Sequence, residues 1–124
     1  MAGSVKYGAM NFDPNFLFAT DERGATVRFS KAERAILLKF TQNPNTVLPR
    51  NRLLDAISGP GSDASDRNID FIINRLRHKL RDSARKPTYI ATQYGEGYVW
   101  IAERATQSRG MTGVFLVVGP VRGM

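Results

Sequence analysis

Residues 65–82 read SDRNIDFIINRLRHKLRD, and this stretch decides the fold. Its aliphatic residues recur at the spacing of one buried face of an α-helix: Ile69, Ile73, Leu76 and Leu80. Asp66 is expected to cap the N-terminus, which gives a helix over residues 66–82. We expect the opposite face to be turned to solvent and to carry Asn68, Phe71, Ile72, Arg75 and Lys79.

The positive charge of the chain is concentrated around this helix. The 124 residues have a net charge of +7, and residues 66–86 carry seven Lys or Arg residues against three Asp residues. A local positive field of this kind attracts polyanions, and a phosphate backbone is the simplest partner. On composition alone, a solvated charged helix with no ligand is the alternative.

Short strands are expected near the N-terminus. Residues 9–29 combine aromatic β-formers with turn sequences, which predicts a small sheet after a tail of residues 1–8. Phe16 and Phe18 are two positions apart, so we expect them to share the buried face of this sheet.

Two helices are expected between the sheet and the basic stretch. Ser30 and Glu33 have the spacing of a capping box, which predicts a helix over residues 30–42. Pro49 suits the first turn of a second helix, over residues 49–58. A loop rich in glycine and serine then separates this helix from the basic one.

A β-hairpin is expected over residues 88–101, after the basic helix. Its loop reads Tyr94-Gly95-Glu96-Gly97, and the glycines permit positive φ angles and a close approach of the backbone to a phosphate or a groove. Residues 102–124 show a weaker pattern and are interpreted as a C-terminal extension or linker.

A helix that reads DNA must anchor one face in the core and offer the other to base edges and phosphates. Arg75 is the best candidate for a base contact, because a guanidinium group can bind O6 and N7 of guanine with two hydrogen bonds. Asn68 could bind adenine in the same way. Phe71 and Ile72 cannot both face the core, so the outer one is expected to pack on thymine methyl groups, on sugars, on the hairpin or on a partner subunit.

The remaining cations of the helix are interpreted as phosphate contacts: Arg67, Arg77, Lys79 and Arg81. We expect at least one of them to pair with Asp66, Asp70 or Asp82 instead, and Asp70 to be a structural ion-pair partner. The complete set of candidate DNA-contacting residues is Arg67, Asn68, Phe71, Ile72, Asn74, Arg75, Arg77, His78, Lys79, Gln93, Tyr94 and Gly95.

The composition argues against an enzyme. The chain has no cysteine, and its single histidine, His78, lies in the basic helix without a nucleophile beside it. No metal-ligand spacing is visible, so neither a metal nor another cofactor is expected. One competing interpretation is that a domain of this kind serves protein contacts, which the apolar Phe71 and Ile72 favour. Another is an RNA-binding domain, but the sequence shows no aromatic-studded sheet of the kind expected for one.

The sequence shows no targeting signal. Residues 1–10 lack the apolar segment of a signal peptide, and the longest apolar run, residues 114–118, is far shorter than a membrane span. We therefore expect a cytoplasmic protein associated with the nucleoid.

Several separated blocks resemble the OmpR/PhoB-type winged helix-turn-helix effector domain of bacterial transcription regulators. They lie in residues 43–54, 65–70, 75–80 and 94–98, within a match over residues 9–101. The resemblance implies an α+β fold with an N-terminal antiparallel sheet, three helices and a C-terminal hairpin wing. It also implies regulation of transcription, binding to double-stranded DNA as a homodimer or in tandem on direct repeats, and a loop from Gly59 to Ser65 that contacts RNA polymerase.

This chain departs from the family pattern at three points. Tyr94 stands where the family commonly has an arginine in the wing, and Ile72 where a histidine is frequent. Only about eight residues precede the first expected strand, so we expect no phospho-acceptor receiver domain in this chain. The expectation is a domain that acts alone, under the control of a partner, or as the front end of a longer protein.

Overall fold

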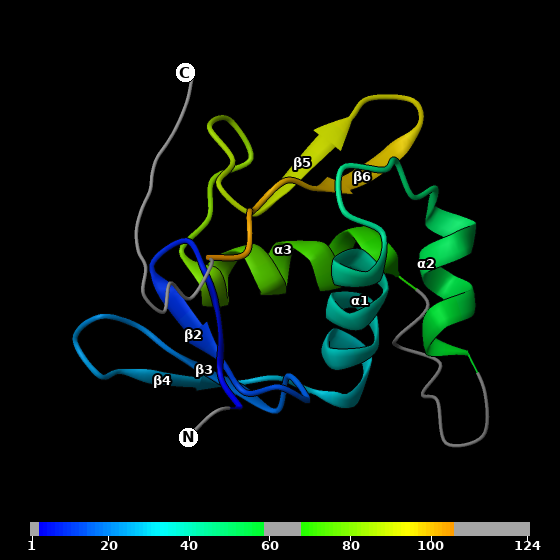
Figure 1. Cartoon of the computed structure of the whole chain (residues 1–124). Helices are drawn as coiled ribbons and strands as arrows, with labels where there is room; N and C mark the ends of the chain where they lie inside the picture. The colour runs from blue at the N-terminus through cyan, green and yellow to red at the C-terminus, as the bar shows by residue number, and fades with distance from the viewer. Residues whose placement is uncertain (1–2, 59–67, 106–124) are drawn as a thin grey trace.

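The structure, a computed structural model, describes residues 3–58 and 68–105 (Figure 1). In this part of the chain, four strands precede three helices and a final hairpin, which confirms the expected α+β winged-helix architecture. The elements are β1 (Val5–Tyr7), β2 (Met10–Phe12), β3 (Phe18–Thr20), β4 (Thr26–Arg28), α1 (Lys31–Gln42), α2 (Arg50–Ile57), α3 (Ile69–Leu80), β5 (Ile90–Gln93) and β6 (Gly97–Trp100). None of the helices in these two ranges has the length and apolar character needed to cross a membrane.

The N-terminal sheet is antiparallel in the order β1-β2-β3-β4. Its first strand falls within residues 1–8, which the sequence assigns to a tail, so that assignment is corrected. The chain also returns to this strand after the hairpin, because Arg104 bridges Tyr7 and the N–H of Ala105 donates to the carbonyl oxygen of Lys6 at 2.8 Å. Both ends of the described chain therefore meet at the same edge of the sheet.

The turn between β2 and β3 overturns one expectation about the buried face. Phe16 has a φ angle of 57°, and Asp13 accepts hydrogen bonds from the backbone of Asn15 and Leu17 in the same turn. This left-handed residue interrupts the strand alternation, so Phe16 is buried while Phe18 is 36% exposed. The two side chains do not share a face.

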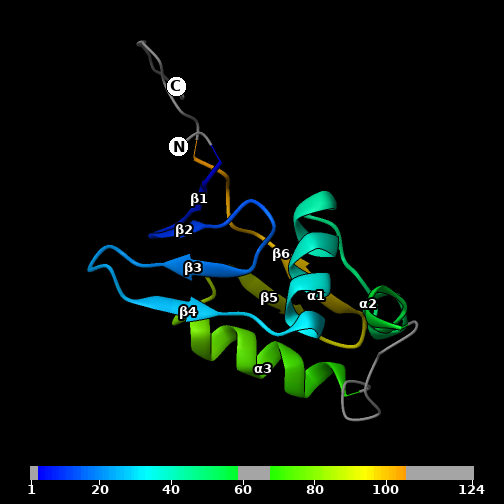
Figure 2. The same cartoon turned by 90° about the horizontal axis from the view of Figure 1, so that it is seen from below.

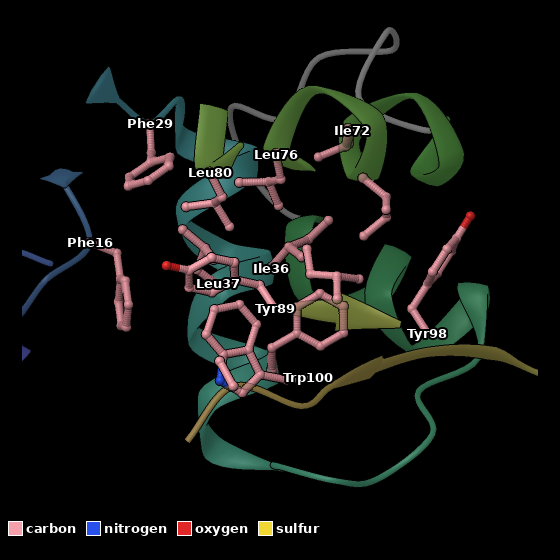
Figure 3. Packing of buried hydrophobic residues seen from close by; sticks show 14 of the residues in the cluster. Phe16, Phe29, Ile36, Leu37, Ile72, Leu76, Leu80, Tyr89, Tyr98 and Trp100 are labelled. Atoms are coloured by element: carbon pink, nitrogen blue, oxygen red, sulfur yellow. The ribbon is translucent and has the colours of Figure 1, made fainter. Parts of the chain in front are cut away.

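The core lies between the sheet, α1, α3 and the hairpin. The predicted capping box is confirmed, because Ser30 and Glu33 exchange both hydrogen bonds at the start of α1. Figure 3 shows Leu76 and Leu80 of α3 directed toward Ile36 and Leu37 of α1. Trp100, fully buried, lies beneath them and packs on aromatic rings: Tyr7, Phe40 and Tyr89. This aliphatic and aromatic packing holds α3 at the surface of the fold.

The wing is the hairpin of β5 and β6, with Ile90 opposite Trp100 and Gln93 opposite Gly97. It is also bonded to the chain that enters α2, since Leu48 and Tyr98 exchange backbone hydrogen bonds of 2.8 and 3.1 Å. A Cβ atom at Gly97 would overlap the carbonyl oxygen of Leu48. Gly97 thus serves a close approach within the fold, whereas the sequence suggested a close approach to DNA.

Candidate nucleic-acid interface

The N-terminus of α3 differs from the prediction. The helix begins at Ile69, and its N-cap is Asn68, whose side chain accepts a hydrogen bond from the N–H of Phe71 at 3.0 Å. Asp66 is therefore not the cap; it and Arg67 lie outside the described residues. The capping bond uses one lone pair of the Asn68 side-chain oxygen, so a two-bond contact with adenine would have to be made with this side chain held in its capping orientation.

The outer face of α3 carries a stripe of exposed side chains. Phe71 is 55% exposed, and Asn74 and His78 are exposed at the next positions on the same face. Figure 2 shows α3 along one edge of the fold, with the other described helices and strands on one side of it. The face presented to solvent is thus polar and aromatic, with cations on its flanks.

Two residues of the predicted contact set point inward. Ile72 is fully buried in the core, so its predicted contact with DNA is wrong. Arg77 is 7% exposed, and its guanidinium donates to the carbonyl oxygen of Ile90 and to the hydroxyl of Thr92. The predicted phosphate contact of Arg77 is also wrong, because the side chain is buried and its Nε and Nη2 donate inside the protein.

Glu33 of α1 is buried and pairs with two cations of α3. Its Oε2 lies 3.0 Å from Nε of Arg75, and its Oε1 lies 2.7 Å from Nζ of Lys79. Burial favours the protonated form, but the hydrogen bonds from Lys79 and Ser30 and the charges of both cations outweigh it, so the pKa of Glu33 lies below its usual range. Lys79 also donates to the carbonyl oxygen of Arg28, which fixes it against the protein rather than toward solvent.

Asp70 ties the first turn of α3 to α2 and to the wing. Its Oδ1 accepts hydrogen bonds from Nε of Arg50 at 2.7 Å and from the hydroxyl of Tyr98. The pKa of Asp70 is held below its usual range, chiefly by the hydrogen bond from Arg50 and next by the one from Tyr98. Burial raises the pKa of the Tyr98 hydroxyl, and its bond to Asp70 raises it further. The expected role of Asp70 as a structural ion-pair partner is confirmed.

The other expected ion pairs have different partners. Arg81, the C-cap of α3, lies 3.6 Å from Asp21 in the β3–β4 turn and is largely exposed. Asp82 instead accepts hydrogen bonds from the backbone N–H groups of the segment that leads into β5 and of its first residue: Thr88, Tyr89 and Ile90. The acidic residues next to the helix therefore organise the fold around it.

The wing loop presents its side chains to solvent. Tyr94 is 85% exposed, and Gln93 and Glu96 are exposed beside it. Gly95 has a φ angle of 79°, with open space where a Cβ atom would stand. The hydrogen bond from Tyr98 to Asp70 joins the wing to the first turn of α3.

Glu33, buried behind α3, is the residue that sequence reasoning missed. It was recognised only as half of a capping box, yet it lies one turn before Ile36 and Leu37 on the apolar face of α1. An acidic residue on a buried face requires a cationic partner, and α3 was the richest source of cations. That signal was present in the sequence.

The exposed side chains of α3 and the wing are polar, aromatic and basic. In residues 3–58 and 68–105, no three His, Asp or Glu side chains gather in a way that could hold a metal ion. The exposed groups can donate and accept hydrogen bonds, stack, and attract anions, which is the chemistry of binding to base edges and phosphates.

Comparisons with known proteins agree with the fold. Residues 24–100 match the protein family described as "Transcriptional regulatory protein, C terminal". The transcriptional regulatory protein AruR of Pseudomonas aeruginosa is 37% identical over 82 residues, which cover 66% of this chain and 34% of AruR. The chain thus spans about a third of the length of this relative.

Solved structures give the same result. The DNA-binding domain of Klebsiella pneumoniae RstA, crystallised in complex with the RstA box, aligns with a TM-score of 0.63 and 30% identity over 79% of this chain and 96% of that domain. The response regulator DrrB of Thermotoga maritima, an OmpR/PhoB homologue, aligns with a TM-score of 0.64 and 28% identity over 80% of this chain and 44% of its own.

Proposed function

Because this chain belongs to the family of transcriptional regulatory proteins with OmpR/PhoB-type DNA-binding domains, we propose that it binds double-stranded DNA sequence-specifically and thereby regulates transcription. The observation that carries the proposal is the exposed face of α3, where Phe71, Asn74 and His78 stand in solvent on a helix anchored by its opposite face. A similar domain, that of RstA, was crystallised with its DNA box.

In this proposal α3 lies in the major groove. Its outer stripe contacts base edges, with Arg75 at the margin of the stripe as the reader of guanine. Phe71 is suited to thymine methyl groups, because it is exposed and does not lie in the core. Asn74 and His78 add donors and acceptors on the same face.

The wing would contact the adjacent minor groove or backbone. Tyr94 and Gln93 are its exposed side chains, and the open surroundings of Gly95 leave room for a phosphate near the backbone. Arg81 is the exposed cation at the C-terminal end of α3, and Arg67 is a further candidate, although it lies outside the described residues. These contacts would set affinity and position rather than sequence.

Fluorescence anisotropy with labelled duplexes tests the proposal. A pool of duplexes with a randomised central region is first selected on the 124-residue chain, and the enriched duplex is compared with a scrambled one across a range of salt concentrations. We expect tighter binding of the enriched duplex, and a logarithm of affinity that falls with the logarithm of salt with a slope of several units if about half a dozen phosphates are contacted. Absent or salt-insensitive binding would contradict the proposal and favour a protein-interaction module.

Further partners are part of the proposal on family grounds alone. Contact with RNA polymerase would use the loop of residues 59–65, which lies outside the described residues. Binding as a homodimer or in tandem on direct repeats would be seen as two-step occupancy of a duplex with two half-sites. A DNA ligand would place the protein with the nucleoid in the bacterial cytoplasm.

A further inference from the structure

Arg75 is held in a defined orientation by two contacts. Its Nε donates to Oε2 of Glu33 at 3.0 Å, and its Cζ lies 5.5 Å from the centre of the Phe71 ring. Within the described part of the chain, the hydrogen bonds of Arg75 are made through Nε alone, so Nη1 and Nη2 remain available. These are the two terminal nitrogens of the guanidinium, and the Arg75 side chain as a whole is 37% exposed.

Glu33 is itself fixed on all sides. Its side chain is 1% exposed, and Oε1 accepts hydrogen bonds from the backbone N–H of Ser30 at 2.8 Å and from Nζ of Lys79 at 2.7 Å. These bonds leave Oε2 for Arg75. A carboxylate locked in this way directs the arginine more strictly than a mobile surface partner would.

From this geometry we propose that Glu33 is a specificity-determining positioning residue: it orients Arg75 so that the two terminal nitrogens of the guanidinium meet O6 and N7 of a guanine. The inference rests on the proposed DNA-binding function and deepens it. Glu33 does not touch the DNA. It acts through Arg75. Because the ion pair already restricts the Arg75 side chain in the free protein, less conformational entropy is lost when Arg75 binds DNA.

The ion pair between Asp70 and Arg50 provides a contrast on the same helix. It too joins a carboxylate to Nε of an arginine, at 2.7 Å, but both side chains are more than half exposed and Arg75 is not part of it. Glu33→Gln and Asp70→Asn each remove one negative charge from the neighbourhood of α3. Only the first should alter the orientation of Arg75, so the second controls for the change in charge.

The test measures base preference rather than affinity alone. The enriched duplex is altered one base pair at a time, and binding is measured for the wild-type chain, Arg75→Ala, Glu33→Gln, Asp70→Asn and the Glu33→Gln/Arg75→Ala double variant. Arg75→Ala identifies the base pair that Arg75 reads, with an expected loss of discrimination of about 5- to 150-fold at a guanine. Glutamine keeps the capping box of α1, because Gln also serves at this position.

The expected result is a loss of preference in Glu33→Gln at that same base pair, with no further loss in the double variant. Discrimination at the other base pairs should stay as in the wild type, and Asp70→Asn should keep the preference at the Arg75 position. Binding of Glu33→Gln to the scrambled duplex should become tighter, with a salt slope steeper by about 0.9 for each phosphate that a released cation contacts. A merely destabilised protein would bind every duplex more weakly.

Two results would overturn the inference. One is an Arg75→Ala chain that discriminates as well as the wild type at every base pair. The other is a Glu33→Gln chain that binds all duplexes more weakly but keeps the base preference of the wild type. Should Glu33→Gln fail to fold, Glu33→Asp keeps the charge, shortens the reach to Arg75 by one methylene, and is expected to lose the same preference. A wild-type chain that binds enriched and scrambled duplexes alike would instead refute the proposed function itself.

Discussion

The guanidinium group of Arg77 in α3 donates two hydrogen bonds to the carbonyl oxygen of Ile90 in β5, from Nε at 3.3 Å and from Nη2 at 2.8 Å. Nη2 also donates to the hydroxyl of Thr92 at 2.8 Å, and the guanidinium lies over the ring of Tyr98, 5.7 Å from its centre. A buried cation therefore joins the helix and the wing, the two elements that would contact DNA. Their relative position is set by side-chain bonds and not only by the loop between them.

Replacing Arg77 is expected to lower stability rather than electrostatic affinity. Arg77→Met keeps most of the side-chain volume but leaves the carbonyl oxygen of Ile90 without its donor, which should reduce the free energy of unfolding by about 1.5–3 kcal/mol. Urea unfolding followed by the fluorescence of the buried Trp100 measures the change. Arg85→Met removes the same charge from an exposed position and should stay within about 0.5 kcal/mol of the wild type. Equal effects of the two variants would contradict this assignment.

The two glycines of the wing should respond differently to alanine. A Cβ atom at Gly97 would overlap the backbone of Leu48, so Gly97→Ala must separate the wing from the start of α2 and is expected to cost about 3 kcal/mol or more. Gly95→Ala meets open space and adds only the strain of a positive φ angle, about 1–2 kcal/mol. Thermal unfolding of both variants makes the comparison. A larger loss at Gly95 would show that the wing does not pack on Leu48 as described.

The sequence predicted the order of the elements because its strongest signals are local. The capping box at Ser30, the aliphatic spacing of α3 and the hairpin loop are each determined by neighbouring residues, and each is confirmed. The start of α3 was harder, since Asp66 and Asn68 are both good caps, and the choice depends on how the helix meets the core.

The side chains around α3 could be predicted less well, because their partners come from distant parts of the chain. Ile72 and Arg77 lie on the two margins of the buried face, and a helix against a core buries more than a narrow stripe. Arg77 is buried only because Ile90 and Thr92 supply acceptors 13 and 15 residues away. The pairing of Arg75 with Glu33 spans 42 residues and depends on the crossing of α1 and α3.

The carboxylate of Glu33 should make stability depend on pH in the acid range. The pKa of Glu33 in the folded protein is lowered, while the pKa of a glutamate in the unfolded chain is about 4.3. Its stabilising effect is therefore complete above about pH 4.3 and is lost as the pH falls through the lower folded value. Glu33→Gln should be less stable than the wild type by about 1–3 kcal/mol at neutral pH, and this difference should shrink as the pH falls toward about 3.

Urea midpoints between neutral pH and about pH 3 measure this difference. Glu22 is exposed in the β3–β4 turn, so Glu22→Gln serves as the control and should follow the wild type across the range. A wild-type advantage over Glu33→Gln that stays constant, or grows in acid, would mean that the pair with Arg75 and Lys79 does not stabilise the charged form.

The exposed ring of Phe71 allows the orientation of α3 in the groove to be tested without relying on charge. Phe71 is 55% exposed and stacks beneath Arg75, so Phe71→Ala removes little buried surface and should change the free energy of unfolding by less than about 0.5 kcal/mol. If the ring packs on a thymine methyl group, replacing that thymine by deoxyuridine, which lacks only the methyl, should weaken wild-type binding by up to about tenfold. The Phe71→Ala chain should bind the thymine and deoxyuridine duplexes equally. Scanning each thymine of the enriched duplex in turn locates the contact. A Phe71→Ala chain that still distinguishes thymine from deoxyuridine wherever the wild type does would show that the ring faces away from the bases. The ring would then be better suited to contact with another protein.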